Sequence, residues 1–384
     1  MEQELIGIEV LQEAKYQDSK ERRYLAWRQD LSPELVETLT QDASCEVRQA
    51  ISKHPNLSAE QIEIMSRDEA WKVRSSIARR PDLTAEQVEL LSHDKDEWVR
   101  EAIAKRDDLT PKQVERLAYD ESCFVRHSVA KRSDLTEGQI TSLTYDESLI
   151  VLEAIAARLD LTEEQVKGLS KDEHWEVREA IAKRPDLTPE VIKALIRDED
   201  WRVRTVIATR PDLTAEQVER LGNDENCWVR KIIAKRSDLT SEQIERLIRD
   251  ENACVRSWVA ARPDLTAEQI ERLTQDKDGY VRETIAKHPH ISPLQVDRLS
   301  QDMRQYIRAT IASRPDLTTE QAVRLSKDKA PKVREAITNN PHARKVLDGL
   351  KKLSKVDERW VCLVLEESSH AQNLLDGLKR KEGI

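Results

Sequence analysis

The chain has 384 residues, of which 35% are charged and 38% apolar, and its formal net charge is −10. Globular proteins average roughly 25% charged and 45–50% apolar residues, so this chain is poor in core-forming residues. Its longest apolar run, 360–365, is far below the ~20 residues that cross a bilayer, so no membrane contact is expected.

The first residues and the cysteines favour a cytoplasmic protein. The start, MEQELIGIEV, has two acids and no basic region, so no secretory signal peptide is expected. Five cysteines scattered along the chain do not form a disulfide framework. We therefore expect a reducing, cytoplasmic location.

The sequence repeats every 26 residues over residues 42–353. Each of twelve consecutive units begins with Asp, and a Val-Arg pair or its variant occupies the sixth and seventh positions. A fixed period of this kind indicates a repeat architecture. The twelve aspartates, which begin repeats 1 to 12, are Asp42, Asp68, Asp94, Asp120, Asp146, Asp172, Asp198, Asp224, Asp250, Asp276, Asp302 and Asp328.

Each repeat is predicted to form two short helices, A and B. Apolar residues at positions 6 and 10 lie one helical turn apart, and Pro at position 14 ends helix A. Asp at position 1 is expected to cap helix A. Thr or Ser at position 17 with Gln at position 20 predicts a capping box for helix B, of about eight residues and partly 3₁₀. Strand-like alternation is absent from the sequence, so the predicted class is all-α.

A single repeat has too few apolar residues to bury its own core, so neighbouring repeats are expected to stack into a solenoid. Residues 1–41 are predicted to form an N-terminal cap, with an amphipathic segment near residues 5–16 and a half repeat from Leu25. Residues 354–384 are predicted to form a degenerate C-terminal repeat or cap. We expect one continuous domain of twelve two-helix repeats.

The pattern D-x5-V-R-x2-I-A-x-R-P-D-L-T-x-E-Q-V-x2-L resembles the leucine-rich repeat variant family and, more loosely, HEAT-like repeats. The resemblance implies a right-handed superhelix of alternating α- and 3₁₀-helices that presents binding surfaces, and it implies no enzymatic activity. The unit here is slightly longer than the family's. Residues 1–41 contain no cysteine, so the iron–sulfur module of one family member is not expected.

Two features of the repeat invite a structural interpretation. In HEAT-like repeats a matching Asp/Arg pair joins neighbouring units, so Asp at position 1 and Arg at position 7 are expected to do so here. Repeat 5 departs from the pattern, because Leu152 replaces the arginine after three apolar residues, 149–151. This departure predicts either a local change of curvature or an apolar docking spot.

The residues that vary between repeats are expected to determine which partner binds. Positions 5, 8 and 12 share one face of helix A. Large aromatic residues are typical of interfaces, although these rings could instead cover the groove between adjacent helices A. The candidate residues are Trp71, Trp98, Phe124, Trp175, Trp201, Trp228, Tyr280 and Tyr306 at positions 4 and 5, with Lys105, Lys131, Lys183, Lys235 and Lys287 at position 12.

Nucleic-acid binding is the alternative. The position-12 lysines and position-13 arginines make a basic stripe beside aromatic rings, a combination that binds phosphates and stacks bases. Helix B carries many glutamates, so the two faces are expected to differ in charge. Against this alternative, the net charge is negative, and each position-13 arginine precedes Asp at position 15 closely enough to pair with it.

Catalysis, metals and cofactors are not expected. Cys45, Cys123 and Cys227 occupy one position in distant repeats, and no third ligand lies near His288 and His290 in the sequence. A catalytic residue should be singular, whereas nearly every residue here has copies. The sequence therefore predicts a non-catalytic scaffold that binds a protein or peptide along the helix A face; it fixes neither the partner's identity nor the oligomeric state.

Overall fold

The computed structural model describes residues 18–353, and every regular element in that range is an α-helix. The predicted all-α class is therefore confirmed. The internal contacts divide the chain into two units after Ile207, near the end of α16, and we describe each unit by itself. The predicted single continuous domain stays a prediction.

The helices of the two units are short and regularly spaced. The first unit contains α2 (Ser19–Leu25), α3 (Pro33–Thr40), α4 (Cys45–Ile51), α5 (Ala59–Ser66), α6 (Trp71–Ala78), α7 (Ala85–Leu91), α8 (Glu97–Ala104), α9 (Pro111–Ala118), α10 (Cys123–Ala130), α11 (Glu137–Leu143), α12 (Leu149–Ala156), α13 (Glu163–Leu169), α14 (Trp175–Ala182), α15 (Pro189–Leu195) and most of α16 (Trp201–Ala208). The second contains α17 (Ala215–Gly222), α18 (Cys227–Ala234), α19 (Ser241–Ile248), α20 (Ala253–Ala260), α21 (Ala267–Thr274), α22 (Gly279–Ala286), α23 (Pro293–Leu299), α24 (Gln305–Ala312), α25 (Thr319–Ser326), α26 (Pro331–Asn339) and α27 (Pro341–Leu353).

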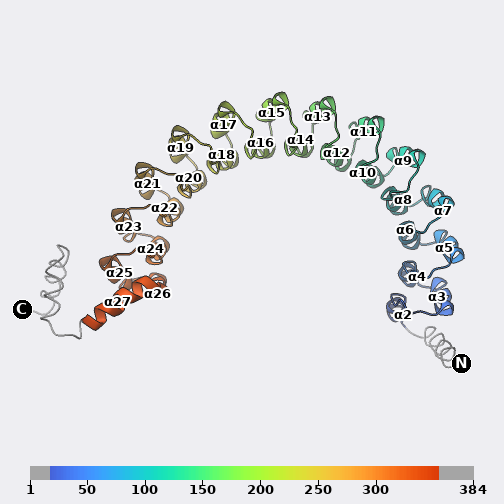
Figure 1. Cartoon of the computed structure of the whole chain (residues 1–384), viewed down its shortest axis with the longest axis horizontal. Helices are drawn as coiled ribbons and strands as arrows, with labels where there is room; N and C mark the ends of the chain where they lie inside the picture. The colour runs from blue at the N-terminus through green and yellow to red at the C-terminus, as the bar shows by residue number, and fades with distance from the viewer. Residues whose placement is uncertain (1–17, 354–384) are drawn as a thin grey trace, which may run out of the picture. The chain divides into compact units, whose positions relative to one another are not determined.

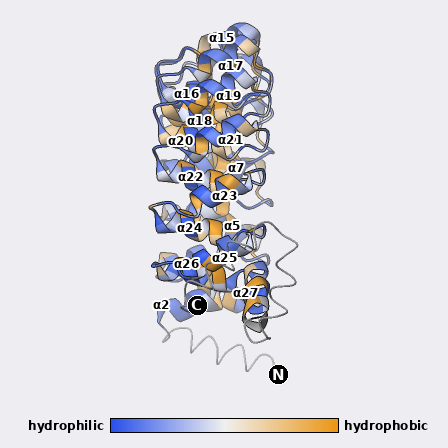
Figure 2. Ribbon diagram, turned by 90° about the vertical axis from the view of Figure 1, so that its left-hand side faces the viewer, coloured by the Kyte–Doolittle hydropathy of each residue, from blue (hydrophilic) through white to orange (hydrophobic). Residues whose placement is uncertain are grey.

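Each unit is a solenoid of two-helix repeats. The even-numbered helices, which are the predicted helices A, pack against one another in sequence, from α2 to α14 in the first unit and from α18 to α26 in the second. The odd-numbered helices B form the other row, and within each unit they lie on the outer side of the curve (Figure 1). Apolar residues of the second unit concentrate between its two rows (Figure 2).

The core lies between the rows, where the repeat places its apolar residues. In repeat 3, Val99 and Ile103 of helix A are fully buried, and Val114 and Leu117 of helix B are almost so. Burying such a side chain contributes roughly 1.5–3 kcal/mol. Because each repeat covers its neighbour's apolar face, the core runs along the unit.

Most helices B begin with the predicted capping box. The Thr110 side chain accepts a hydrogen bond from the Gln113 amide at 3.4 Å, and the Gln113 side chain accepts one from the Thr110 amide at 2.8 Å. Helices B are α-helical over seven or eight residues from α3 to α25 and over 13 residues in α27, so the expected partly 3₁₀ character is wrong within the described residues. The capping bonds satisfy the first-turn amides of a regular α-helix, and backbone bonds to the residue three before occur at the helix ends, as from Leu35 N to Ser32 O and from Arg67 N to Ile64 O (both 3.1 Å).

Asp at position 1 does not cap helix A, which corrects a second expectation. Asp42 Oδ1 accepts from the amide of Ser44 at 2.8 Å, and Ser44 is itself the N-cap residue of α4. The aspartate therefore shapes the turn before the helix, as Asp does when it bonds to the backbone two residues later.

The N-terminal half repeat is longer than predicted. Arg22 of α2 pairs with Asp42 at 2.6 Å, and Arg28 pairs with Asp30 at 2.7 Å, with the sequence spacings found in the later repeats. Helices α2 and α3 therefore form a two-helix repeat in register with the rest. The predicted segment near residues 5–16 and the C-terminal repeat at 354–384 lie outside the described residues. Within 18–353, none of the helices combines the length and apolarity needed to traverse a lipid bilayer.

Candidate partner-binding face

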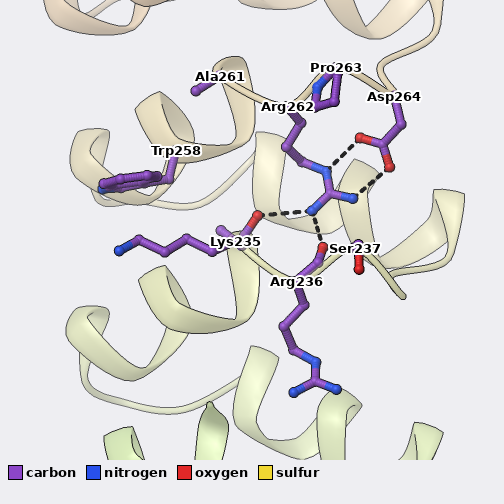
Figure 3. A pocket seen from close by; sticks show the side chains of 9 residues that line it. Lys235, Arg236, Ser237, Trp258, Ala261, Arg262, Pro263 and Asp264 are labelled. Atoms are coloured by element: carbon purple, nitrogen blue, oxygen red, sulfur yellow. Dashed lines mark hydrogen bonds and ion pairs between the residues drawn. The ribbon is translucent and has the colours of Figure 1, made fainter. Parts of the chain in front are cut away.

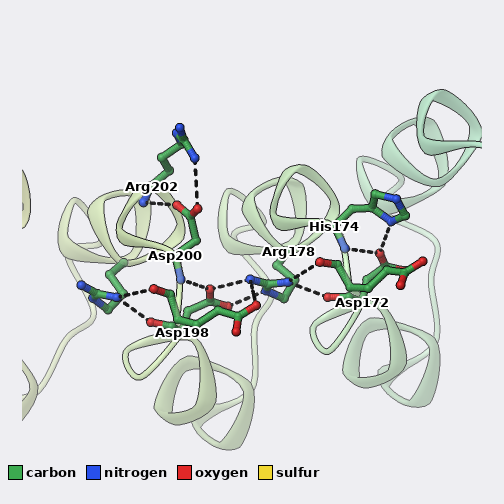
Figure 4. Close-up of polar contacts among 9 residues, drawn as sticks. Asp172, His174, Arg178, Asp198, Asp200 and Arg202 are labelled. Carbon is green, nitrogen blue, oxygen red and sulfur yellow. Dashed lines mark hydrogen bonds and ion pairs between the residues drawn. The ribbon is translucent and has the colours of Figure 1, made fainter.

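An arginine–aspartate pair joins most neighbouring repeats, as predicted. Arg178 Nε donates to Asp198 Oδ2 at 2.7 Å and Nη2 donates to Asp198 Oδ1 at 2.9 Å, while Nη1 donates to the carbonyl of Asp172 at 2.7 Å (Figure 4). The hydrogen bonds that Arg178 donates to the Asp198 carboxylate raise the pKa of Arg178 above its ordinary value. The guanidinium thus fastens the turn of its own repeat to the turn of the following one.

The same bidentate pair recurs in both units, with both partners largely buried. The pairs are Arg48–Asp68, Arg74–Asp94, Arg100–Asp120, Arg126–Asp146, Arg178–Asp198, Arg230–Asp250, Arg256–Asp276, Arg282–Asp302 and Arg308–Asp328. These charges serve the scaffold and are not displayed to a partner.

Repeat 5 replaces the link with a local one. Leu152 is buried where other repeats carry the arginine. Asp172 keeps the turn bond of the other position-1 aspartates, from the His174 amide at 2.8 Å, and in addition contacts His174 Nδ1 at 2.9 Å. Leu159 of the same repeat is 70% exposed in the following turn. The two alternatives for this repeat, changed curvature and an apolar docking spot, stay predictions.

The position-13 arginines are also internal. Arg262 pairs with Asp264 at 2.6 Å, and its Nη1 donates to the carbonyl of Ala234 at 3.0 Å and to that of Arg236 (Figure 3). Its hydrogen bond holds the pKa of Asp264 below the ordinary value. The arginines that pair in this way are Arg80, Arg106, Arg132, Arg158, Arg184, Arg210, Arg236, Arg262 and Arg314.

Three predicted aromatic residues come together in the first unit. The Trp98 ring lies 6.4 Å from that of Trp71 and stacks on that of Phe124 at 5.2 Å, measured between centroids. They stand in the first turns of α6, α8 and α10, and each is 37–42% exposed. We call Trp71, Trp98 and Phe124 the first aromatic cluster. Its rings contact one another across three neighbouring helices A while each stays partly exposed, and whether they cover the groove between these helices or bind a partner stays a prediction.

The other predicted aromatics form smaller groups. The Arg202 guanidinium lies 4.4 Å from the ring centroid of Trp175 and 5.4 Å from that of Trp201. Tyr280 and Tyr306 stack at 6.0 Å. A Cβ atom at residue 279 would meet the Tyr306 hydroxyl and the side chain of Arg304, so the glycine there leaves room for this arrangement.

A second aromatic cluster contains a residue that the sequence analysis missed. Lys231 Nζ lies 4.4 Å from the Trp228 ring centroid and 5.4 Å from that of Trp258, and Lys235 Nζ lies 4.0 Å from that of Trp258. Trp258 occupies position 9, outside the positions considered for the face. The candidate rings all stand at positions 4 and 5, so the repeat pattern gave no signal for a ring at position 9.

The predicted lysines differ in their surroundings. Those of repeats 3, 6 and 10 pair with a glutamate one turn earlier, as in Lys183–Glu179 (2.6 Å) and Lys287–Glu283 (3.0 Å), and Lys105 pairs with Glu101 in the same way. Lys131 and Lys235 belong to repeats that carry His127 and Lys231 at that place.

Helices B are less acidic than expected, because arginines on them offset part of the glutamate charge. Glu271 accepts a hydrogen bond from Gln295 of the next repeat at 2.9 Å and pairs with Arg298. Arg116 pairs with Glu89 across repeats at 3.3 Å. Arginines at position 23 therefore offset the glutamates at position 22. Within residues 18–353, no three His, Cys, Asp or Glu side chains are placed to hold a metal ion, and Cys45, Cys123, Cys227 and Cys254 are free thiols.

Stacked two-helix repeats with half-exposed rings along helix A define this chain as an α-solenoid repeat protein. It is similar to a solved structure described as a leucine-rich repeat variant with a novel repetitive structural motif, at 25% identity over 61% of this chain and 88% of that one, with a TM-score of 0.45. It is also similar to an engineered protein at 15% identity, covering 83% of this chain and 98% of that one, with a TM-score of 0.25. No family model and no curated protein matches it.

Proposed function

We propose that this chain is a non-catalytic cytoplasmic scaffold that binds a protein or peptide partner along the helix A face. The first aromatic cluster supports the proposal, because Trp71, Trp98 and Phe124 lie against one another and stay partly exposed to solvent. Clustered aromatic side chains combine large apolar area with little loss of side-chain entropy, which is why they dominate protein interfaces.

Nucleic-acid binding through the Lys/Arg and aromatic stripe is less favoured. The position-13 arginines are occupied by aspartates and backbone carbonyls, as for Arg262. The three lysines paired with glutamates are partly neutralised. Fewer of these arginines and lysines are therefore available to bind a phosphate backbone than the sequence suggests.

The test starts by identifying proteins that co-purify with the full chain from its host and then measures the purified partner by calorimetry. Replacing the three residues of the first aromatic cluster with Ala should weaken binding at least ~10-fold. Tyr119→Ala with Tyr145→Ala is the matched control, because both tyrosines are exposed at the ends of helices B. Full affinity after the cluster substitution contradicts the proposal. A salt-sensitive oligonucleotide complex without any protein partner favours the alternative.

A further inference from the structure

The second unit has a groove at the C-terminal ends of α18 and α20. A cavity of about 390 Å³ is lined by Lys235, Trp258, Ala261 and Pro263, together with Arg262 and Asp264. Figure 3 shows the Lys235 side chain beneath the Trp258 ring and Arg262 turned toward Asp264. The groove therefore has an apolar wall and a cationic rim.

Its positive charge is less compensated than that of Lys105, Lys183 and Lys287 on the helix A face. Lys183 and Lys287 each have a glutamate one turn earlier, whereas Lys235 has Lys231 at that position. In repeat 9, which supplies Trp258, the corresponding two positions carry Ser257 and Ala261.

The carboxylates beside the groove are paired with arginines. Asp264 pairs with Arg262 at 2.6 Å, and Asp238 pairs with Arg236 at 2.6 Å. The ammonium groups of Lys231 and Lys235 instead lie over the Trp258 ring, an arrangement that holds a cation near an apolar surface without neutralising it. An incoming carboxylate gains a charge-assisted hydrogen bond there, and its apolar neighbour gains contact with the ring.

We propose that this groove binds an acidic peptide segment that also carries apolar side chains. The inference rests on the proposed function and specifies the chemistry of the partner. Lys231 and Lys235 bind carboxylates, while Trp258, Ala261 and Pro263 contact the apolar side chains between them.

The experiment measures fluorescence anisotropy of a labelled peptide of repeated Glu-Leu-Gly units and of its Gln-Leu-Gly analogue, with the full chain at low salt. The acidic peptide should bind about tenfold more tightly than the amide analogue. That preference is notable because the chain as a whole carries −10. It should weaken as salt shortens the screening length.

Two charge-removing variants decide the assignment, with folding checked by circular dichroism. Lys231→Gln with Lys235→Gln should abolish the preference for the acidic peptide, whereas the matched control Lys183→Gln with Lys287→Gln should keep it. Trp258→Ala should weaken binding of both peptides. Equal binding of the two peptides by the unmodified chain overturns the inference, as does an equal loss in the control variant.

Two further outcomes separate this inference from the proposed function. If single-stranded DNA binds more tightly than the acidic peptide through the same lysines, the peptide assignment is overturned. If the peptide preference is absent but the first aromatic cluster is still needed for the co-purified partner, the inference fails while the proposed function stands.

Discussion

Arg308 and Asp328 join two neighbouring repeats through two parallel hydrogen bonds, from Nε to Oδ2 at 2.6 Å and from Nη2 to Oδ1 at 2.8 Å. The remaining nitrogen of Arg308 donates to the carbonyl of Asp302 at 2.7 Å. One side chain therefore fastens its own turn and the next repeat. This explains why the arginine and the aspartate recur together along the chain.

Replacing one linking arginine should strongly destabilise the second unit. Arg256→Leu leaves the largely buried Asp276 without its guanidinium and the Asp250 carbonyl without a donor. We expect the free energy of unfolding, measured with urea, to fall by about 3 kcal/mol. Arg334→Leu is the control, because Arg334 is exposed and bonds to backbone carbonyls. Similar losses for both variants would show that the carboxylate link adds little.

The exception in repeat 5 predicts a measurable coupling. Leu152→Arg should place a guanidinium on Asp172 and make His174 less important. His174→Ala should cost about 1 kcal/mol in the natural chain and clearly less in the Leu152→Arg background. A double-mutant cycle in urea measures the difference. A coupling energy of zero would mean that His174 does not substitute for the missing arginine.

The capping boxes predict a contrast between two threonines at the same repeat position. Thr214 accepts from the Gln217 amide at 3.3 Å, whereas Thr188, which has Val191 in place of the glutamine, makes no side-chain cap bond. Thr214→Ala should therefore lower stability by about 1 kcal/mol. Thr188→Ala should have a much smaller effect in the same urea titration. The reverse order would contradict the role assigned to the box.

The position-15 aspartates predict a loss of stability in acid. The pKa of Asp264 is lowered in the fold by Arg262, so the unfolded chain binds protons more readily than the folded chain. The stabilisation is complete above the ordinary Asp pKa of about 3.9 and is lost as the pH falls through the folded value. Each half-exposed pair should contribute less than about 1 kcal/mol. Asp264→Asn should lower the urea midpoint at neutral pH and have no effect in strong acid; an effect independent of pH would contradict the assignment.

Much of the fold was readable from the sequence because the repeat places one residue type in one environment many times. Burial of positions 6 and 10 and the capping boxes followed from spacing, and the resemblance to HEAT-like repeats implied the Asp/Arg link. The repeat at α2 and α3 was missed in part because the unit that carries Arg22 and Arg28 does not have Asp at position 1. The bonds from position-13 arginines to backbone carbonyls could not be predicted. Every residue has a backbone carbonyl, so the sequence does not show which one accepts a hydrogen bond.

The candidate face was less predictable than the fold. The sequence spacing identified Trp98 and Phe124 as candidates. Whether their rings stack depends on the distance between neighbouring helices A, which the sequence does not give. Trp258 was missed because it lies next to the buried Val259, where a core residue was the simpler expectation. Whether a lysine is paired depended on residues in its own helix, and this was visible in the sequence for Lys183 and Glu179.

Hydrogen–deuterium exchange of the full chain with and without its co-purified partner tests the central claim most directly. The account predicts slower exchange on binding in the first turns of α6, α8 and α10, with little change in α7, α9 and α11. Slower exchange confined to the odd-numbered helices would contradict it, because the partner would then occupy the opposite face.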